Sequence, residues 1–289
     1  MATSFNIIGS GQVGTCLGLL LHRHGLQVGS VYNRNLDSTK RAIDLIGAGH
    51  SAAQIGDIEP ADITVFTVND DALESASAQF SQTNALRQGD LVFHCSGATP
   101  STILAPLAKS GAQIASLHPV MTFTDPAQDA ARFPGTACAI EGDAVAVARL
   151  EGLFTSLGAV CFQIDGTAKL LYHASAVFVS NYLHCLFDAG AQCLEAAGLP
   201  REKATEILGP LITASLNNTF AMGPAAALTG PIARGDAKLV AAQLNDLKAY
   251  DSDLASAYAA LGAIAVDLSR QKGAATPQDL DQIATYFKQ

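Results

Sequence analysis

Residues 5–14 read Phe5-Asn6-Ile7-Ile8-Gly9-Ser10-Gly11-Gln12-Val13-Gly14 and decide the fold of the chain. The first four predict a short buried strand, and the apolar spacing from Cys16 to Leu21 predicts a helix that ends near Gly25. Three glycines spaced G-x-G-x-x-G between a strand and a helix are typical of a loop that binds a dinucleotide, with its phosphates at the helix N-terminus. We therefore expect the six loop residues to bind such a cofactor: Gly9, Ser10, Gly11, Gln12, Val13 and Gly14. The alternative is a strand–helix turn that merely favours glycine.

The second expected strand, at residues 27–32, indicates which dinucleotide is bound. A site for NAD usually has Asp or Glu after this strand, where the carboxylate binds the ribose 2′-hydroxyl. Here the neutral Asn33 and the cationic Arg34 follow it. A guanidinium can hold a 2′-phosphate with charge-assisted hydrogen bonds, so we expect NADP(H), bound by Asn33 and Arg34. The alternative is that Arg34 is a solvated loop residue.

The predicted secondary structure changes near residue 165, from alternating strands and helices to helices alone. Before it, near-continuous apolar strands alternate with helices, which predicts an α/β Rossmann fold with a doubly wound, mostly parallel sheet. After it, only helical patterns follow. We therefore expect a dinucleotide-binding Rossmann domain at 1–165 and an all-helical domain for substrate binding and dimerisation at 166–289. The expected strands are 5–8, 27–32, 63–68, 91–95, 114–117, 137–140 and 160–164, and the expected helices of the second domain are 167–197, 201–220, 236–249, 250–271 and 277–287.

Composition narrows the class of protein. The chain has 289 residues, a formal net charge of −9 and no basic run, which argues against a nucleic-acid partner. Six scattered cysteines without a C-x-x-C pair predict reduced thiols, with neither a metal site nor disulfides. The first strand begins too close to Met1 for a signal peptide, so we expect a cytoplasmic protein. Residues 170–187 contain no Asp, Glu, Lys or Arg but include polar residues such as His173 and His184, which favours a helix buried in a domain or homodimer core over a membrane span.

Small or polar residues follow the expected strands at the carboxyl edge, where an open parallel sheet binds its ligands. The relevant positions are Val68-Asn69, Ser96-Gly97 and His118. We expect Val68, Asn69, Ser96 and Gly97 to contact the cofactor, and Ser96 and His118 to bind a substrate. Turns also favour small and polar residues, so the alternative for each is that it only forms the turn after its strand.

The first helix of the second domain carries a polar stripe formed by Lys169, His173, Ser180 and His184. Lys169 is the only formally charged residue between Asp165 and Asp188, and His173 lies one turn further on. We expect these two as catalytic residues, since a desolvated ammonium is a strong partner for an oxyanion. The alternative for Lys169 is a lysine whose stem lies along apolar surface while its ammonium reaches solvent, and the alternative for His173 is a histidine in the core. For His184 we favour a place in the core.

Residues 229–236 interrupt the helices and predict a loop that ends at an N-cap, Asp236. Arg234 in this loop could bind a substrate carboxylate, even one in a partner subunit's site, or pair with an acidic side chain. The sequence favours neither.

The whole chain resembles the superfamily of 6-phosphogluconate and β-hydroxyacid dehydrogenases, with ketopantoate reductase and pyrroline-5-carboxylate reductase as relatives. These enzymes join a Rossmann domain to a helical domain and often carry a catalytic lysine in a K-x-x-x-N motif. Lys169-Leu170-Leu171-Tyr172-His173 is similar but holds His in place of Asn. His118-Pro119 also resembles a substrate-side motif of prephenate dehydrogenases.

A narrower resemblance is to an uncharacterised bacterial family, described provisionally as oxidoreductases, with a Rossmann-like domain and a C-terminal domain of unknown function. It rests on four segments: 94–98, 116–123, 172–182 and 230–236. Together the resemblances imply an NADP(H)-dependent oxidoreductase acting on a small oxo- or hydroxy-acid or an imine, with Asn181 and Arg234 among the substrate-binding residues. The alternatives are a non-catalytic NADP(H)-binding sensor and a deazaflavin-dependent NADP oxidoreductase.

Overall fold

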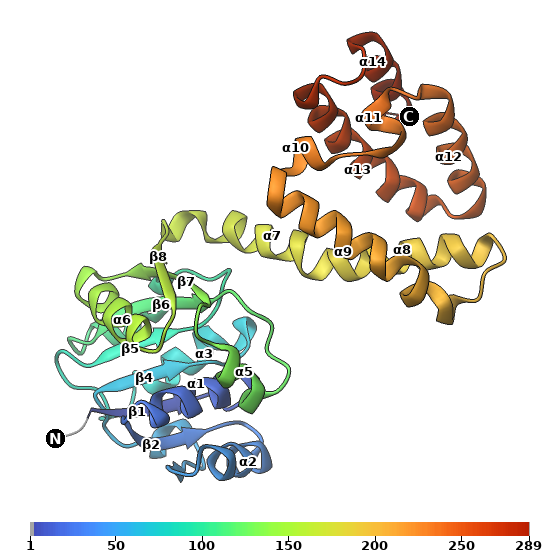
Figure 1. Ribbon diagram of the computed structural model, residues 1–289. Coiled ribbons are helices and arrows are strands. Elements are labelled where there is room, and N and C mark those ends of the chain that lie inside the picture. Colours follow the sequence, from blue (N-terminus) through green and yellow to red (C-terminus); the bar gives the residue numbers. More distant parts are fainter. Residues whose placement is uncertain (1–2, 289) are drawn as a thin grey trace. The chain divides into compact units, whose positions relative to one another are not determined.

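A computed structural model describes residues 3–288 of the chain (Figure 1). The chain divides into two compact units, residues 1–179 and 180–289. The last strand, β8, ends at Gln163, so the change from α/β to helical structure comes near the expected residue 165. The division into units comes one helix later, because α7 (Lys169–Val179) belongs to the first unit.

The first unit contains one eight-stranded sheet with the order β3-β2-β1-β4-β5-β6-β7-β8. Neighbouring strands are parallel except β6 and β7, which are antiparallel. The strands are β1 (Ser4–Ile8), β2 (Gln27–Tyr32), β3 (His50–Ser51), β4 (Ile63–Phe66), β5 (Leu91–His94), β6 (Gln113–Pro119), β7 (Ala137–Gly142) and β8 (Val160–Gln163). The expected fold class, a Rossmann fold with a mostly parallel sheet, is confirmed. The strand order reverses between β1 and β4, which creates the crevice where such sheets bind ligands.

Helices cover both faces of this sheet. On one face, Leu17 of α1 and Phe154 of α6 belong to a buried cluster with Phe5 and Phe93. On the other face, Leu73 of α3 packs in a second cluster. Alternate strand residues face opposite clusters, so the strands are apolar on both sides. The helices of this unit are α1 (Gln12–Arg23), α2 (Leu36–Ile46), α3 (Asp70–Phe80), α4 (Ala105–Ala108), α5 (Pro126–Arg132), α6 (Ala144–Ser156) and α7.

The second unit is helical in its described residues. Its buried core joins Val240, Val266, Leu280 and Ile283. The helices are α8 (Asn181–Ala196), α9 (Ala204–Met222), α10 (Pro224–Ala227), α11 (Gly230–Arg234), α12 (Ala237–Tyr250), α13 (Ser252–Lys272) and α14 (Pro277–Tyr286). The expected N-cap at Asp236 is confirmed, since its carboxylate accepts a hydrogen bond from Leu239 N at 3.1 Å.

Two local expectations are wrong, and one short strand was not expected. The helix expected at 167–197 is interrupted at Ser180, so the stripe from Lys169 to His184 is not continuous; Val179 and Ser180 favour helix only weakly. The expected loop before Asp236 contains α11, which begins at Gly230-Pro231 and ends at Gly235 in the left-handed conformation. The short edge strand β3 has no signal in the sequence, because two residues are too few to show a period.

The cysteines are free thiols. Within residues 3–288, no helix combines the length and the apolar character that crossing a membrane requires. The same residues contain no group of three or more His, Cys, Asp or Glu side chains that could hold a metal ion.

Candidate functional site

The glycine loop between β1 and α1 has the geometry that the sequence predicts. Gly9 has φ +106°, and a Cβ there would lie 2.6 Å from the backbone of Thr67 and Val68. A Cβ on Gly14 would lie 2.1 Å from the Gly9 carbonyl oxygen. A Cβ on Gly11, by contrast, would meet nothing within 4 Å. The first and third glycines are therefore needed for packing, while the second leaves open space above the loop.

The N-terminus of α1 is suited to an anion. The Gly11 N-cap provides no side-chain hydrogen bond, and the first turn has no acidic residue. The first N–H groups of a helix lack partners within the helix and carry a partial positive charge. Next to them, the Ser10 hydroxyl is 4% exposed and lacks a hydrogen-bond partner among the described residues. Free backbone donors and an unpaired buried hydroxyl are what a bound phosphate would satisfy.

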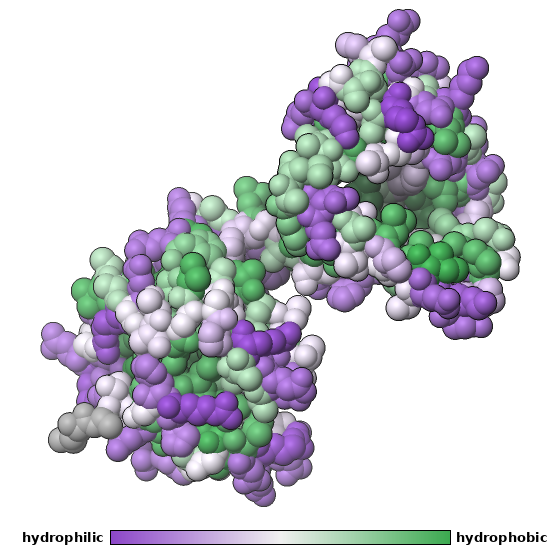
Figure 2. All heavy atoms as spheres, in the orientation of Figure 1, coloured by the Kyte–Doolittle hydropathy of each residue, from purple (hydrophilic) through white to green (hydrophobic). Residues whose placement is uncertain are grey.

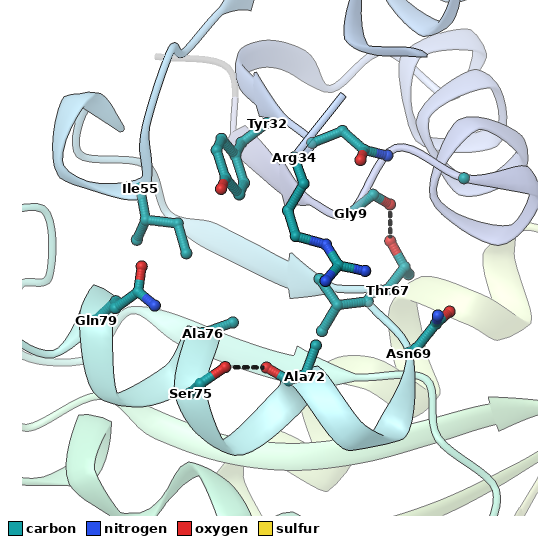
Figure 3. A pocket seen from close by; sticks show the side chains of 13 residues that line it. Gly9, Tyr32, Arg34, Ile55, Thr67, Asn69, Ala72, Ser75, Ala76 and Gln79 are labelled. Carbon is teal, nitrogen blue, oxygen red and sulfur yellow. Dashed lines mark hydrogen bonds between the residues drawn. The ribbon is translucent and has the colours of Figure 1, made fainter. Parts of the chain in front are cut away.

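A cavity of about 250 Å³ opens beside this loop, between the carboxyl ends of β1, β2 and β4 (Figure 3). Arg34 points into it, and the ring of Tyr32 lies at its side. Arg34 forms no ion pair with any described residue, so its guanidinium is available to a ligand. Besides Gly9 and Gly11, four of the residues predicted to bind the cofactor line the cavity: Asn33, Arg34, Val68 and Asn69. The rest of its lining is Tyr32, Ile55, Thr67, Ala72, Ser75, Ala76 and Gln79.

A second group of polar residues lies at the ends of β5 and β6. The Ser96 hydroxyl accepts hydrogen bonds from the backbone N–H groups of Ala98 (3.2 Å) and Thr99 (2.9 Å), which leaves its own proton to donate. Gly97 is buried, and a Cβ there would lie 2.6 Å from the His173 ring and 2.8 Å from His118 Nε2. Ser96, Gly97, His118 and His173 are thus brought together within the first unit.

Lys169 begins α7 and is 1% exposed. Its ammonium donates to the Ser96 carbonyl at 2.9 Å and to the Ser116 hydroxyl at 2.5 Å. Its third neighbour is a Glu141 carboxylate oxygen at 3.6 Å. Burial lowers the pKa of Lys169, and the Glu141 charge opposes that shift. The ammonium therefore has protein acceptors on all sides.

The Glu141 carboxylate is held in turn by Ser101. It accepts 2.7 Å hydrogen bonds from the Ser101 backbone N–H and from the Ser101 hydroxyl. Glu141 lies opposite Ser116 in the antiparallel pairing of β6 with β7. The sequence analysis missed Glu141, Ser116 and Ser101, although a lone acidic residue at the end of an apolar strand was a visible signal.

His118 forms the other half of this cluster. Its Nδ1 lies 2.8 Å from the Tyr172 hydroxyl, and the two rings meet edge to face. Burial lowers the pKa of His118 to about 4, with smaller contributions from the charges of Lys169 and His173. Burial raises the pKa of Tyr172 to about 12. At neutral pH the imidazole is therefore neutral and the phenol keeps its proton.

Two predicted substrate-binding residues belong to the second unit. Asn181 is the first residue of α8. Arg234 lies in the last turn of α11 and is exposed. Their roles stay predictions.

Two family models match the sequence. Residues 2–119 match a Rossmann-like domain, and residues 136–264 match a domain of unknown function, DUF2520. The chain pairs these two domains. This supports the pairing of domains in the narrower resemblance, while membership of the wider dehydrogenase superfamily stays a prediction. No curated protein matches the chain by sequence.

Solved structures share the fold. BF3122 from Bacteroides fragilis, provisionally described as an NADP oxidoreductase, is 22% identical with a TM-score of 0.73, over 94% of this chain and 98% of that one. Protein TM1727 from Thermotoga maritima is 22% identical with a TM-score of 0.71, over 93% and 99%. A reductive aminase from Aspergillus terreus, in complex with NADPH and ethyl-5-oxohexanoate, is 16% identical with a TM-score of 0.62, over 100% and 93%.

Proposed function

We propose that the protein is an NADP(H)-dependent oxidoreductase that interconverts a small C=O or C=N compound, such as an oxo-acid or an imine, with its reduced form. The observation that carries the proposal is the cavity beside the glycine loop, into which an unpaired Arg34 projects. Structures of like fold that bind NADPH, such as the reductive aminase, support it.

The residues around the cavity fit the cofactor. The N-terminus of α1 and the Ser10 hydroxyl would hold the pyrophosphate, and Asn33 and Arg34 the 2′-phosphate of the ribose. Val68, Asn69 and Gly97 would line the path toward the end of β5. When bound, NADPH supplies a hydride.

The cluster at the ends of β5 and β6, formed by Ser96, Gly97, His118 and His173, would bind the substrate through mostly neutral groups. We assign His173 to orientation of the substrate beside Gly97, and Ser96 and His118 to its polar atoms. Lys169, expected as a catalytic residue, has its donors occupied by protein acceptors, so we revise its role to positioning. Arg234, for a substrate carboxylate, and Asn181 stay proposed substrate-binding residues of the second unit.

Replacing Arg34 with alanine should weaken NADPH binding by about tenfold to a hundredfold, since hydrogen bonds to a charged group contribute about 1.5–3 kcal/mol. NADH lacks the 2′-phosphate, so its affinity should change by less than about twofold. Calorimetric titration of each variant with both cofactors measures this. Lys40→Ala, an exposed change on the neighbouring helix α2, is the matched control. Equal losses for NADPH and NADH would contradict the role given to Arg34.

We also propose a homodimer, formed through the apolar surface of the helices that follow the sheet. Large apolar side chains on these helices are exposed, among them Leu171 (80%), Leu211 (64%) and Phe220 (81%). Figure 2 shows hydrophobic residues at the surface of the helical unit. Surface of this kind commonly marks a protein–protein interface. Light scattering should give twice the chain mass of 29.8 kDa, and a monomer would contradict the proposal.

A further inference from the structure

Two neutral groups, the Tyr172 phenol and the His118 imidazole, form a hydrogen-bonded pair beside Gly97. We propose that Tyr172 delivers the proton that reduction of the substrate requires, and that His118 resupplies it. This inference rests on the proposed oxidoreductase function and names the proton donor of the same site.

The side chains of His118 and Tyr172 are more exposed to solvent than that of Lys169. His118 and Tyr172 are both half-buried, whereas Lys169 is 1% exposed. An ammonium has three donors, and those of Lys169 face the Ser96 carbonyl, the Ser116 hydroxyl and the Glu141 carboxylate. A proton donor must come within hydrogen-bond distance of the substrate atom, which the enclosed ammonium of Lys169 cannot do, so we assign that role to the half-buried Tyr172.

The surroundings of the pair keep it in the required protonation state. Besides Tyr172, the titratable groups that act on His118 are Lys169, His173 and Asp70. Burial is the largest cause of the lowered pKa of His118, the charges of Lys169 and His173 add to it, and that of Asp70 opposes it. The Phe162 ring packs against the Tyr172 ring. A neutral imidazole has one N–H and one lone pair, so it can donate through Nδ1 to the phenol oxygen while accepting at Nε2.

Gly97 packs closely against the Nε2 edge of the His118 ring. A Cβ at position 97 would lie 2.8 Å from Nε2 and 2.9 Å from Cε1. Any other residue there would press against this edge of the ring, so glycine is required for the close packing. Because His118 is half-buried and not enclosed, the proposed relay takes solvent as the source of the proton at Nε2 and passes one on from Nδ1.

The proton balance closes with solvent as the final proton donor and without another acidic side chain. Reduction of C=O or C=N needs a hydride, which comes from NADPH, and a proton. The π electrons of the double bond move to its oxygen or nitrogen, which takes the Tyr172 proton. The phenolate oxygen then takes the Nδ1 proton of His118, and Nε2 takes one from water or a hydronium ion. His118 is left as its other tautomer, and exchange with solvent restores the starting state.

The first test needs no cofactor. In ¹⁵N NMR spectra of protein labelled in histidine, the His118 signals should stay those of a neutral ring down to about pH 4. Tyr172→Phe removes the partner of Nδ1, so it should shift the Nδ1 signal of His118. Tyr250→Phe, at a site that is 52% exposed, is the matched control and should leave it unchanged. Titration of His118 near pH 6.5, or an unshifted Nδ1 signal in Tyr172→Phe, would overturn the pairing.

The second test measures reduction of cyclohexanone and of 1-pyrroline with NADPH. Tyr172→Phe should lower kcat by about a hundredfold or more, with little change in KM or in the Kd for NADPH. A kcat within about threefold of the wild-type value would overturn the role of Tyr172 and leave the proposed function standing. Failure of the wild-type protein to bind NADPH, or to reduce either probe, would contradict the proposed function itself.

Discussion

Gly14→Ala should disrupt the glycine loop and lower the free energy of unfolding by about 3 kcal/mol. The added Cβ would lie 2.1 Å from the Gly9 carbonyl oxygen and 2.4 Å from the Thr67 hydroxyl. That hydroxyl donates to the same carbonyl, so helix α1 would have to move away from β1 and β4. Urea unfolding of the full chain, followed by far-UV circular dichroism, measures the loss.

Gly11→Ala is the matched variant, because its Cβ would meet nothing within 4 Å and its φ of −80° suits alanine. The free energy of unfolding should change by only about 0.5 kcal/mol. NADPH affinity should nevertheless fall by tenfold or more (about 1.4 kcal/mol), because the methyl group occupies the space above the loop. Similar destabilisation by the two alanines would contradict the separate roles given to the glycines, as would unaltered NADPH binding in Gly11→Ala.

Lys169→Met should destabilise the protein by about 3–5 kcal/mol, because it leaves the buried Glu141 carboxylate without its counter-charge. Lys109→Met, at an exposed lysine, should have almost no effect on stability. The charge of Lys169 helps to lower the pKa of His118, so that pKa should rise in Lys169→Met. Urea unfolding measures the first effect and histidine NMR the second.

The double variant Lys169→Met/Glu141→Gln distinguishes the ion pair from simple packing. With both charges gone, most of the lost stability should return, since no buried charge remains without a partner. The Gln side chain keeps an oxygen that can accept from Ser101. If the double variant were as unstable as Lys169→Met alone, the loss would come from the shape of the methionine and not from an unpaired carboxylate.

The cavity beside the glycine loop, which is the proposed cofactor site, was largely predictable from the sequence. The glycine spacing and Arg34 depend on contacts within the first strand–helix–strand segment, where distance along the chain determines distance in space. The ends of β5 and β6 could also be grouped, because all carboxyl ends of parallel strands lie at one edge of the sheet. Ser96, Gly97 and His118 are neighbours for that reason.

The surroundings of Lys169 could not be predicted in this way. They depend on the register of β6 with β7, which places Glu141 opposite Ser116, and no local pattern specifies an antiparallel register between distant segments. Without Glu141, an isolated lysine on an apolar helix resembles a catalytic group. The sequence likewise could not show that Tyr172, rather than Lys169, faces His118, because both lie near the start of α7.

The Ser10 hydroxyl is buried and unpaired among the described residues. Such a group costs the folded chain about 1–3 kcal/mol until a ligand atom accepts its proton. A ligand that binds only the folded state adds stability as its free concentration rises above its Kd. With NADP(H) as the proposed ligand, the lifetime of the chain in a cell should therefore follow the supply of that dinucleotide. When that pool runs low, unfolding becomes more frequent, proteases remove more of the protein, and its abundance falls without any change in its synthesis.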